Sequence, residues 1–252
     1  MIPYRDLSQS LMDAIGLAVP PVAVIFHQQS PPSVPKADAP VPAGCKFWEI
    51  GSTRSVITGA KDHRFCAVGV HTHNIDGAPE TQSAELRETL AAMQGLDYVR
   101  PEEVATLPVL ETGSRYIQYA PLAETTVRPS VVLLFARASQ ALVLSEAAAR
   151  VDGATPPALG RPACALIPQV RNSGRSAASL GCCGARSYLD VLGDDVALWG
   201  LPGEKLELYV NEIETFAKAN AVLTRFHQRR RADVDSGSAP TVKQSLARLQ
   251  KG

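Results

Sequence analysis

Several features that would assign this sequence to a common functional class are missing from it. The 252 residues carry no net charge, and the one run of like charge is Arg229-Arg230-Arg231. Binding to nucleic acid through phosphates needs a concentrated basic field, so we expect no nucleic-acid partner. The longest apolar run, over residues 131–135, is far too short to cross a bilayer, so we expect no membrane contact either.

The N-terminal segment lacks the basic region and the apolar core of a secretory signal peptide. We therefore expect a cytoplasmic protein, whose thiols stay reduced and form no disulfide framework. The odd number of cysteines, five, supports this expectation. Metal ligation, catalysis and simple burial remain as roles for them.

Familiar active-site motifs are missing as well. The glycines fit neither the phosphate loop GxxxxGK[ST] nor the dinucleotide pattern GxGxxG. There is no GxSxG nucleophile elbow, no HExxH motif and no CxxC pair of the kind that structural zinc sites use. The sequence therefore names no reaction, and whether the protein is an enzyme stays open.

The cysteines that are present divide between the two halves of the chain. Cys45 and Cys66 lie in the first half, and Cys164 lies in the second with the adjacent Cys182 and Cys183. The interval from Cys45 to Cys66 is three residues longer than the interval from Cys164 to Cys182. The two halves thus repeat one spacing.

Each set of cysteines also follows a proline-led apolar run, residues 20–26 in the first half and 129–135 in the second. This repeated order predicts an internal duplication, with two related strand-loop-Cys half-units over about 6–110 and 111–203 that share one core. Chance similarity of two short buried strands is the alternative.

The hydrophobic pattern predicts an α+β fold, with a mixed α/β fold as the alternative. We expect helices over 6–17, 81–96, 139–150 and 204–231, and strands over 22–26, 55–58, 116–119 and 131–135. The helix over 204–231 closes a single globular domain over 1–231. The last segment, 232–252, is rich in Asp, Ser, Gly, Pro and Lys, and we expect a flexible tail there.

A duplicated fold can bring thiols from both halves to one place. Sets of four thiolates hold Zn²⁺ or an iron–sulfur cluster. We expect an iron–sulfur cluster, with zinc as the alternative, and a redox, sensing or cofactor-handling role. The competing interpretation is that small, buried cysteines fill the core without a ligand.

One turn in the second half is unusual in its composition. Gly181 and Gly184 flank Cys182 and Cys183. Glycines let the backbone come close to a ligand and leave N–H groups free to bond sulfur or an anion. We therefore expect these four residues to lie at or around the bound group.

A thiol chemistry without metal is the alternative function. Cys66 or Cys182 would act as a nucleophile, with His63 as its base, in an enzyme or small-molecule-binding protein. Lys46 and Arg186 would hold a small anionic ligand. A redox partner is the alternative to such a ligand, and the protein could also form a homo-oligomer.

Taken together, several stretches resemble the family called domain of unknown function 169, from about residue 6 to residue 218. The resemblance depends on residues 20–24, 45–48, 62–63, 66, 69, 119–122, 129–132, 164–165, 179–186 and 201–203. In the family pattern Cys182 matches the second cysteine of the final motif, and Cys183 falls at a variable position. The resemblance thus implies the set Cys45, Cys66, Cys164 and Cys182, with Cys183 as the spare, and it implies no activity.

Overall fold

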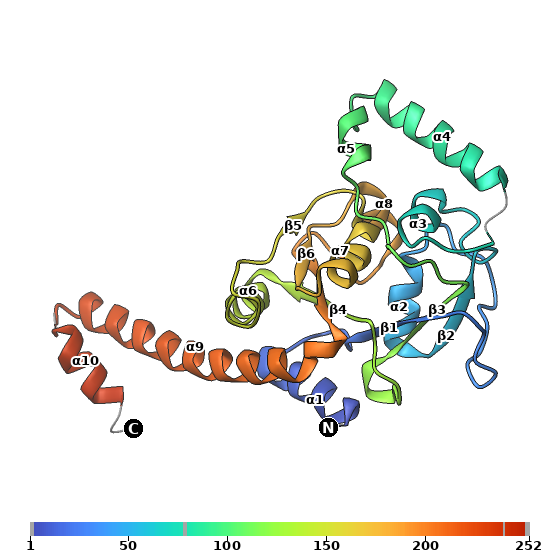
Figure 1. Ribbon diagram of the computed structural model, residues 1–252. Helices are drawn as coiled ribbons and strands as arrows, with labels where there is room; N and C mark the ends of the chain where they lie inside the picture. Colours follow the sequence, from blue (N-terminus) through green and yellow to red (C-terminus); the bar gives the residue numbers. More distant parts are fainter. Residues whose placement is uncertain (1–2, 78–79, 239, 250–252) are drawn as a thin grey trace.

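A seven-stranded β-sheet in the order β2-β3-β1-β4-β7-β6-β5 runs through the protein (Figure 1). The computed structural model describes residues 3–77, 80–238 and 240–249. The strands are β1 (Val22–His27), β2 (Val56–Gly59), β3 (Tyr116–Pro121), β4 (Val131–Arg137), β5 (Ala158–Leu159), β6 (Ala177–Ser179) and β7 (Val196–Pro202). Neighbouring strands are antiparallel except for the parallel pair β5 and β6.

Helices cover both faces of the sheet, and the predicted α+β class is confirmed. They are α1 (Tyr4–Ile15), α2 (Lys46–Thr53), α3 (Ala67–Thr72), α4 (Glu80–Gly95), α5 (Pro101–Ala105), α6 (Ala138–Asp152), α7 (Leu166–Ser173), α8 (Cys183–Tyr188), α9 (Leu206–Asp235) and α10 (Val242–Leu249). Short 3-10 turns are η1 (Leu122–Glu124), η2 (Ala163–Ala165) and η3 (Gly203–Lys205). In the part of the chain that the structure describes, no helix combines the length and the apolar character needed to cross a membrane.

The central strands have apolar side chains on both faces. On β4, Leu133 and Phe135 pack into one core, while the intervening Leu134 packs into the other. Successive side chains of a strand point to opposite faces, so a strand buried on both faces is apolar at every position. This explains why the run over 131–135 lacks the alternation of a half-exposed strand.

The two faces have different coverings, and we name them accordingly. The cysteine face carries α2, α3, α7 and α8, and its apolar core contains or contacts Cys45, Cys66, Cys164 and Cys182. The helix face carries α1, α6 and α9, and its core is mainly Leu, Val and Ala. The sheet therefore separates two cores of different chemistry.

The strand order has a regular form about the central pair of β1 and β4. Outward from this pair the order is β1-β3-β2 on one side and β4-β7-β6 on the other. In the first half, β1 and α2 precede the outer strand β2, and α3 then precedes β3, which lies between β1 and β2. In the second half, β4 and α7 precede the outer strand β6, and α8 then precedes β7, which lies between β4 and β6. This order fits the predicted half-units, while duplication of the sequence itself stays a prediction.

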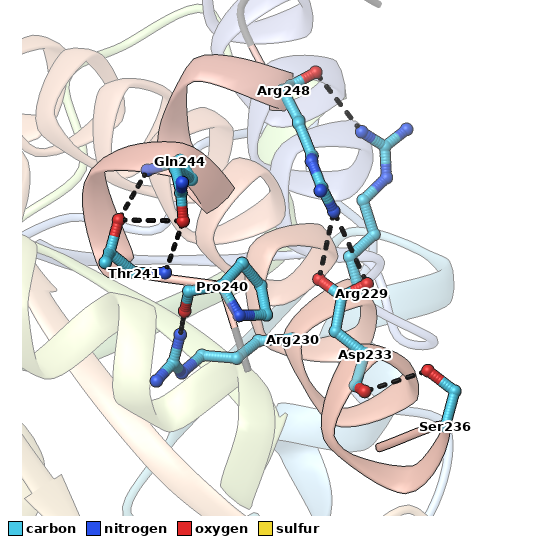
Figure 2. Close-up of polar contacts among 8 residues, drawn as sticks. All are labelled: Arg229, Arg230, Asp233, Ser236, Pro240, Thr241, Gln244 and Arg248. Atoms are coloured by element: carbon cyan, nitrogen blue, oxygen red, sulfur yellow. Dashed lines mark hydrogen bonds and ion pairs between the residues drawn. The ribbon is translucent and has the colours of Figure 1, made fainter. Parts of the chain in front are cut away.

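Helix α9 continues past the predicted end at residue 231 and runs out from the sheet, and α10 folds back beside its far end (Figure 1). Figure 2 shows the polar contacts that join the two helices. The Arg248 guanidinium lies 3.4 Å from the Asp233 carboxylate, and Arg229 donates to the Arg248 carbonyl at 3.4 Å. The segment predicted as a tail thus contains a helix, and its flexibility in solution stays a prediction.

Candidate four-cysteine site

Each of the four predicted ligand cysteines lies where a helix begins on the cysteine face. Cys45, Cys66 and Cys182 are the N-cap residues of α2, α3 and α8. Cys164 lies in η2, which leads directly into α7. The first turn of a helix has backbone N–H groups without intrahelical partners, and N–H groups lie against the sulfurs of Cys66 and Cys182.

The four side chains belong to the same core but differ in exposure. Cys45 is 7% exposed and Cys164 is 8% exposed. Cys66 and Cys182 are half-buried and pack against the same core. Two thiols therefore lie at its edge and two within it.

The thiols are close enough to influence one another's ionisation. Burial raises the pKa of Cys45 to about 12, and negative charge on Cys66 and Cys182 contributes to this rise. Burial also raises the pKa of Cys164, and all three other thiols contribute. A cation among the sulfurs would reverse these effects, because it favours the thiolate form. The structure thus brings the four predicted ligands into one electrostatic neighbourhood.

Hydrogen-bond donors lie against the sulfurs. The backbone N–H of Ala185 donates to Cys182 Sγ at 3.5 Å. Burial raises the pKa of Cys66, and the N–H groups of Gly44 and Gly69 oppose this rise. Donors in such positions orient thiolate ligands and tune the metal that they hold.

Two glycines allow the backbone to approach Cys66 closely. A Cβ atom at Gly69 would lie 2.8 Å from Cys66 Sγ. A Cβ atom at Gly44 would lie 3.8 Å from that sulfur and 2.6 Å from His63 Nδ1. Contacts under 3 Å are too short for a real Cβ atom, so the Cys66 sulfur favours glycine at position 69 and the His63 ring favours glycine at position 44.

His63 lies next to Cys66, and its carbonyl accepts the Cys66 backbone N–H at 2.8 Å. Its ring is fully buried, with Nε2 at 3.0 Å from Thr58 Oγ1. Since Thr58 gives its single hydroxyl proton to the Ile117 carbonyl, the Thr58 oxygen accepts from His63, which assigns the proton to Nε2. Burial lowers the pKa of His63 to about 3, so the ring is neutral at physiological pH.

Lys46, predicted to hold an anionic ligand, makes contacts within the protein. Its Nζ atom lies 2.7 Å from the Glu49 carboxylate and 2.9 Å from that of Asp190. The Glu49 side chain also accepts the Asp190 backbone N–H at 2.8 Å. This arrangement joins α2 to the segment that follows α8 and already satisfies the lysine charge.

Arg186 has a comparable role within its own loop. Its guanidinium donates to the carbonyls of Leu180, Gly193 (2.8 Å) and Val196 (3.2 Å). Gly181, at the start of this loop, has φ +81°, a left-handed conformation that favours glycine. Both residues therefore shape the turn that presents Cys182.

Cys183 and Gly184, the other two residues of this turn, lie outside the apolar core of the cysteine face. Cys183 is exposed, and its Sγ atom accepts a hydrogen bond from the Tyr98 hydroxyl at 3.4 Å. At Gly184, an added Cβ atom would meet only the Tyr188 ring at 3.7 Å, an ordinary contact. The exposure of Cys183 is compatible with its place as the spare cysteine.

Three further polar side chains of the cysteine face were not among the predicted site residues. Tyr119, Trp48 and His73 are fully buried. The Trp48 side chain is a hydrogen-bonding neighbour of the Tyr119 hydroxyl, and the Cys164 backbone is one of the His73 ring. In the sequence, Tyr119 looks like an ordinary core residue.

The four thiols are not arranged around a single point. Among residues 3–77, 80–238 and 240–249, no three His, Cys, Asp or Glu side chains form a group that could hold one metal ion. The thiols share a region and an electrostatic environment, but not the coordination sphere of one ion.

A separate cavity lies elsewhere, between the end of β1 and the end of α7. Its lining comes from residues 26–28, 110–114, 130 and 171–172, and it contains none of the cysteines. Arg171 is the one basic side chain in this lining apart from His27. The cavity adds nothing to the thiol site.

Together these features define an α+β protein with four cysteines gathered on one face of its sheet. The chain belongs to the family called domain of unknown function 169, described as "Uncharacterised ArCR", whose model matches residues 10–212. This match confirms the resemblance seen in the sequence, and it includes all four cysteines and Tyr119. No curated protein and no solved structure matches the chain.

Proposed function

We propose that this protein binds an iron–sulfur cluster through Cys45, Cys66, Cys164 and Cys182 and has a redox, sensing or cofactor-handling role. The observation that supports this most is the origin of the thiols. They come from four separate helix starts, two in each half of the chain, and meet in one core. When bound, the cluster would supply one-electron chemistry.

The arrangement of the thiols favours a cluster over a single zinc ion. One tetrahedral zinc ion needs four ligands around one point, at about 2.0–2.3 Å from the metal. The described residues contain no such group, although charge on each buried thiol's neighbours affects its ionisation. An occupant several atoms wide suits thiols that are near one another without converging on a point.

The surroundings of the thiols also weigh against simple core filling. A cysteine that only fills space needs no donors at its sulfur and no glycines beside it. Cys66 has Gly69 so close that a methyl group there would meet its sulfur at 2.8 Å, and Cys182 accepts an N–H bond.

The alternative of a nucleophilic thiol has less support. A Cys–His pair works when the imidazole takes the thiol proton. Here burial raises the pKa of Cys66 and lowers that of His63 to about 3, so both shifts oppose the transfer.

Anaerobic reconstitution with ferrous iron and sulfide tests the proposal. We expect a brown protein with visible absorption bands and with iron and sulfide bound in comparable amounts per chain. Each of the variants Cys45→Ser, Cys66→Ser, Cys164→Ser and Cys182→Ser should lose the bound cluster. Zinc uptake under matched conditions, without iron and sulfide uptake, would indicate zinc as the occupant in place of a cluster.

Cys183→Ser is the matched control, because it changes a neighbouring exposed thiol and should bind the cluster as the wild type does. Thermal unfolding of each ligand-free variant shows whether it is folded. A wild-type protein that stays colourless and metal-free would contradict the proposal. Full uptake of iron and sulfide by the four single variants would contradict it as well.

A further inference from the structure

Past its contacts with α1 and α6, helix α9 runs out from the sheet and the helices packed on it (Figure 1). We call its outer part, residues 218–235, the arm. Within the arm, all residues over 219–225 except Asn220 are exposed. Asn220, Val222 and Thr224 are weak helix formers, and a short isolated helix is marginal in water. The single chain therefore gives this stretch little of the packing that normally stabilises a helix.

The exposed side of α9 carries a continuous stripe without charge. This outer stripe consists of Leu208, Asn211, Thr215, Ala219 and Val222, all exposed and spaced by three or four residues, so they lie on one face of the helix. Leu208 is 57% exposed and Val222 is 42% exposed. The opposite face of the same helix is buried, through Leu206, Tyr209, Val210 and Ile213. The outer stripe therefore points away from the protein and crosses from its surface onto the arm.

The stripe continues at Phe226, and there the chain covers it with a helix of its own. Phe226 is 8% exposed, and it lines a small cavity together with Ser245 of α10. The contacts that hold α10 at this end of the arm are those of Figure 2. The uncovered part of the stripe thus ends where α10 begins, and a packed helix fits its continuation.

The charges along α9 change sign near the start of the arm. Over residues 206–217 every charged side chain is acidic, and over residues 218–231 every one is basic. Some of these charges have contacts within the chain. Glu212 faces Arg150 of α6 at 3.2 Å, and Arg229 and Arg230 donate to carbonyls of the segment that contains α10. Such a helix repels a parallel copy of itself and attracts an antiparallel one.

Four other charges of α9 form one flank of the outer stripe. Glu207, Glu214, Lys218 and Arg225 each directly precede a stripe residue or Phe226, so all four lie to the same side of it. Seven residues separate the two glutamates, and seven separate the two basic residues. In an antiparallel pair of identical helices, each flank faces the same flank of the other copy. One register therefore places Glu207 opposite Arg225 of the second copy and Glu214 opposite its Lys218.

We propose that this protein forms a twofold-symmetric dimer, in which the outer stripe of α9 packs antiparallel against the outer stripe of a second copy. Burial of Leu208, Ala219 and Val222 stabilises the dimer, and the two kinds of ion pair, each formed twice, set its orientation. The register leaves α10 in place, because it uses the stripe only as far as residue 225. The surface lies on the helix face, and the arm lies beyond residue 212, where the family match ends. The dimer is therefore independent of the proposed function.

Sedimentation equilibrium of the full-length protein over a series of concentrations tests the proposal. We expect the wild type to approach twice the chain mass. Val222→Glu puts a carboxylate in the middle of the stripe, where the dimer would bury it, and should raise the dissociation constant about tenfold. The single chain should tolerate this change, because Val222 is exposed and the new carboxylate has Lys218 and Arg225 within one helical turn. Circular dichroism checks that the variant is folded.

Val234→Glu is the matched control. It makes the same substitution on the same helix, at a residue that is 57% exposed and lies beyond the proposed contact. Its dissociation constant should equal that of the wild type. If Val222→Glu also has the wild-type dissociation constant, the outer stripe is not the interface and the proposal is overturned.

The charges provide a test of the antiparallel orientation. Arg225→Glu and Glu207→Arg should each raise the dissociation constant about fivefold, and the double variant should restore the wild-type value. The two residues lie about 27 Å apart along one helix, so they cannot pair within a single chain. A double variant that is no better than the single variants would overturn the antiparallel pairing.

The basic arm also allows a different partner to be tested in the same experiment. A wild type that stays monomeric at every concentration overturns the proposal. The same holds for a monomer that binds a DNA duplex and loses this binding in Arg225→Glu, since the arm would then serve a nucleic acid. A wild-type dimer that Val222→Glu dissociates, and that the double charge variant restores, supports it.

Discussion

The two faces of the sheet treat buried polar groups differently. On the helix face, the side chain of Asp152 is 2% exposed, and its carboxylate has three partners. Tyr209 donates to it at 2.6 Å and Ser176 at 2.7 Å, and Lys205 Nζ lies at 3.6 Å. On the cysteine face, the Tyr119 hydroxyl is fully buried with the Trp48 side chain as its hydrogen-bonding neighbour. Polar groups on the helix face thus surround a buried charge, whereas the Tyr119 hydroxyl lies among thiols whose negative charge would raise its pKa further.

The difference has an energetic consequence. Neutral buried histidines reduce the stability of the ligand-free protein, because water satisfies these groups in the unfolded chain. A ligand that binds only the folded protein stabilises it further. We therefore expect the cysteine face to respond to ligand and to pH.

The largest effect on stability should come from the helix face. Leu134 is 0% exposed, and Leu134→Ala should lower the free energy of unfolding by about 3 kcal/mol, since it leaves a cavity in a close-packed core. Urea unfolding of the ligand-free protein measures this. Cluster uptake per folded molecule should stay at the wild-type level. A loss of uptake beyond the loss of folded protein would show that the two faces are not independent.

Gly69→Ala should have the next largest effect, and it should act on the site. The added methyl group would meet Cys66 Sγ at 2.8 Å, so the sulfur or the start of α3 must shift. We expect about 2 kcal/mol of destabilisation from overpacking, and cluster uptake reduced at least tenfold. Iron content and urea unfolding check the two effects.

Gly184→Ala is the matched control for this change, because its methyl group would make only an ordinary contact at 3.7 Å with Tyr188. It should retain uptake. Equal uptake by Gly69→Ala and the wild type would mean that the Cys66 sulfur is not held where a ligand needs it.

Acid should weaken the fold through the cysteine face. Burial lowers the pKa of His63 to about 3 and that of His73 to about 4, against an ordinary value of 6.5. The unfolded chain therefore takes up protons below about pH 6.5, while the folded protein does not until the pH nears 4. Stability is fully present above pH 6.5 and falls as the pH decreases, by about 1 kcal/mol per histidine between pH 7 and pH 5.5.

The variant His73→Leu separates this contribution from other acid effects. Urea unfolding of the ligand-free protein at pH 7 and at pH 5.5 should show a loss smaller by about 1 kcal/mol in the variant than in the wild type. An identical loss in both proteins would mean that His73 is not held neutral by burial.

Much of the fold follows from local patterns in the sequence. The strands β1 and β4 and the helices α6 and α9 are strongly patterned, and their predicted positions agree with the structure to within a few residues. The strand β7 was missed, because Gly200 and Pro202 weaken its β pattern and its pairing with distant β4 forms it. Helices α3 and α8 have six residues each, too few for a helical period to show.

The site was predictable only in part, for a related reason. The repeated spacing of the cysteines indicates which thiols belong together, since spacing is a property of the sequence. Whether a buried hydroxyl is paired depends on neighbours that the fold supplies. The surroundings of Tyr119 depend on the pairing of β3 with β1 and β2. No local pattern in the sequence therefore distinguishes Tyr119 from Tyr209, whose hydroxyl donates to Asp152.

The smallest effect should come from Lys46, the residue beside Cys45 that the sequence suggests as an anion holder. Its charge already faces Glu49 and Asp190, which join α2 to the segment after α8. Lys46→Gln should therefore lower stability by less than about 1 kcal/mol, the usual range for ion pairs near the surface. Uptake of iron and sulfide should remain within twofold of wild type. A sharp fall in uptake with stability intact would show that the lysine charge faces the ligand, and would make an anionic occupant the better explanation of the cysteine face.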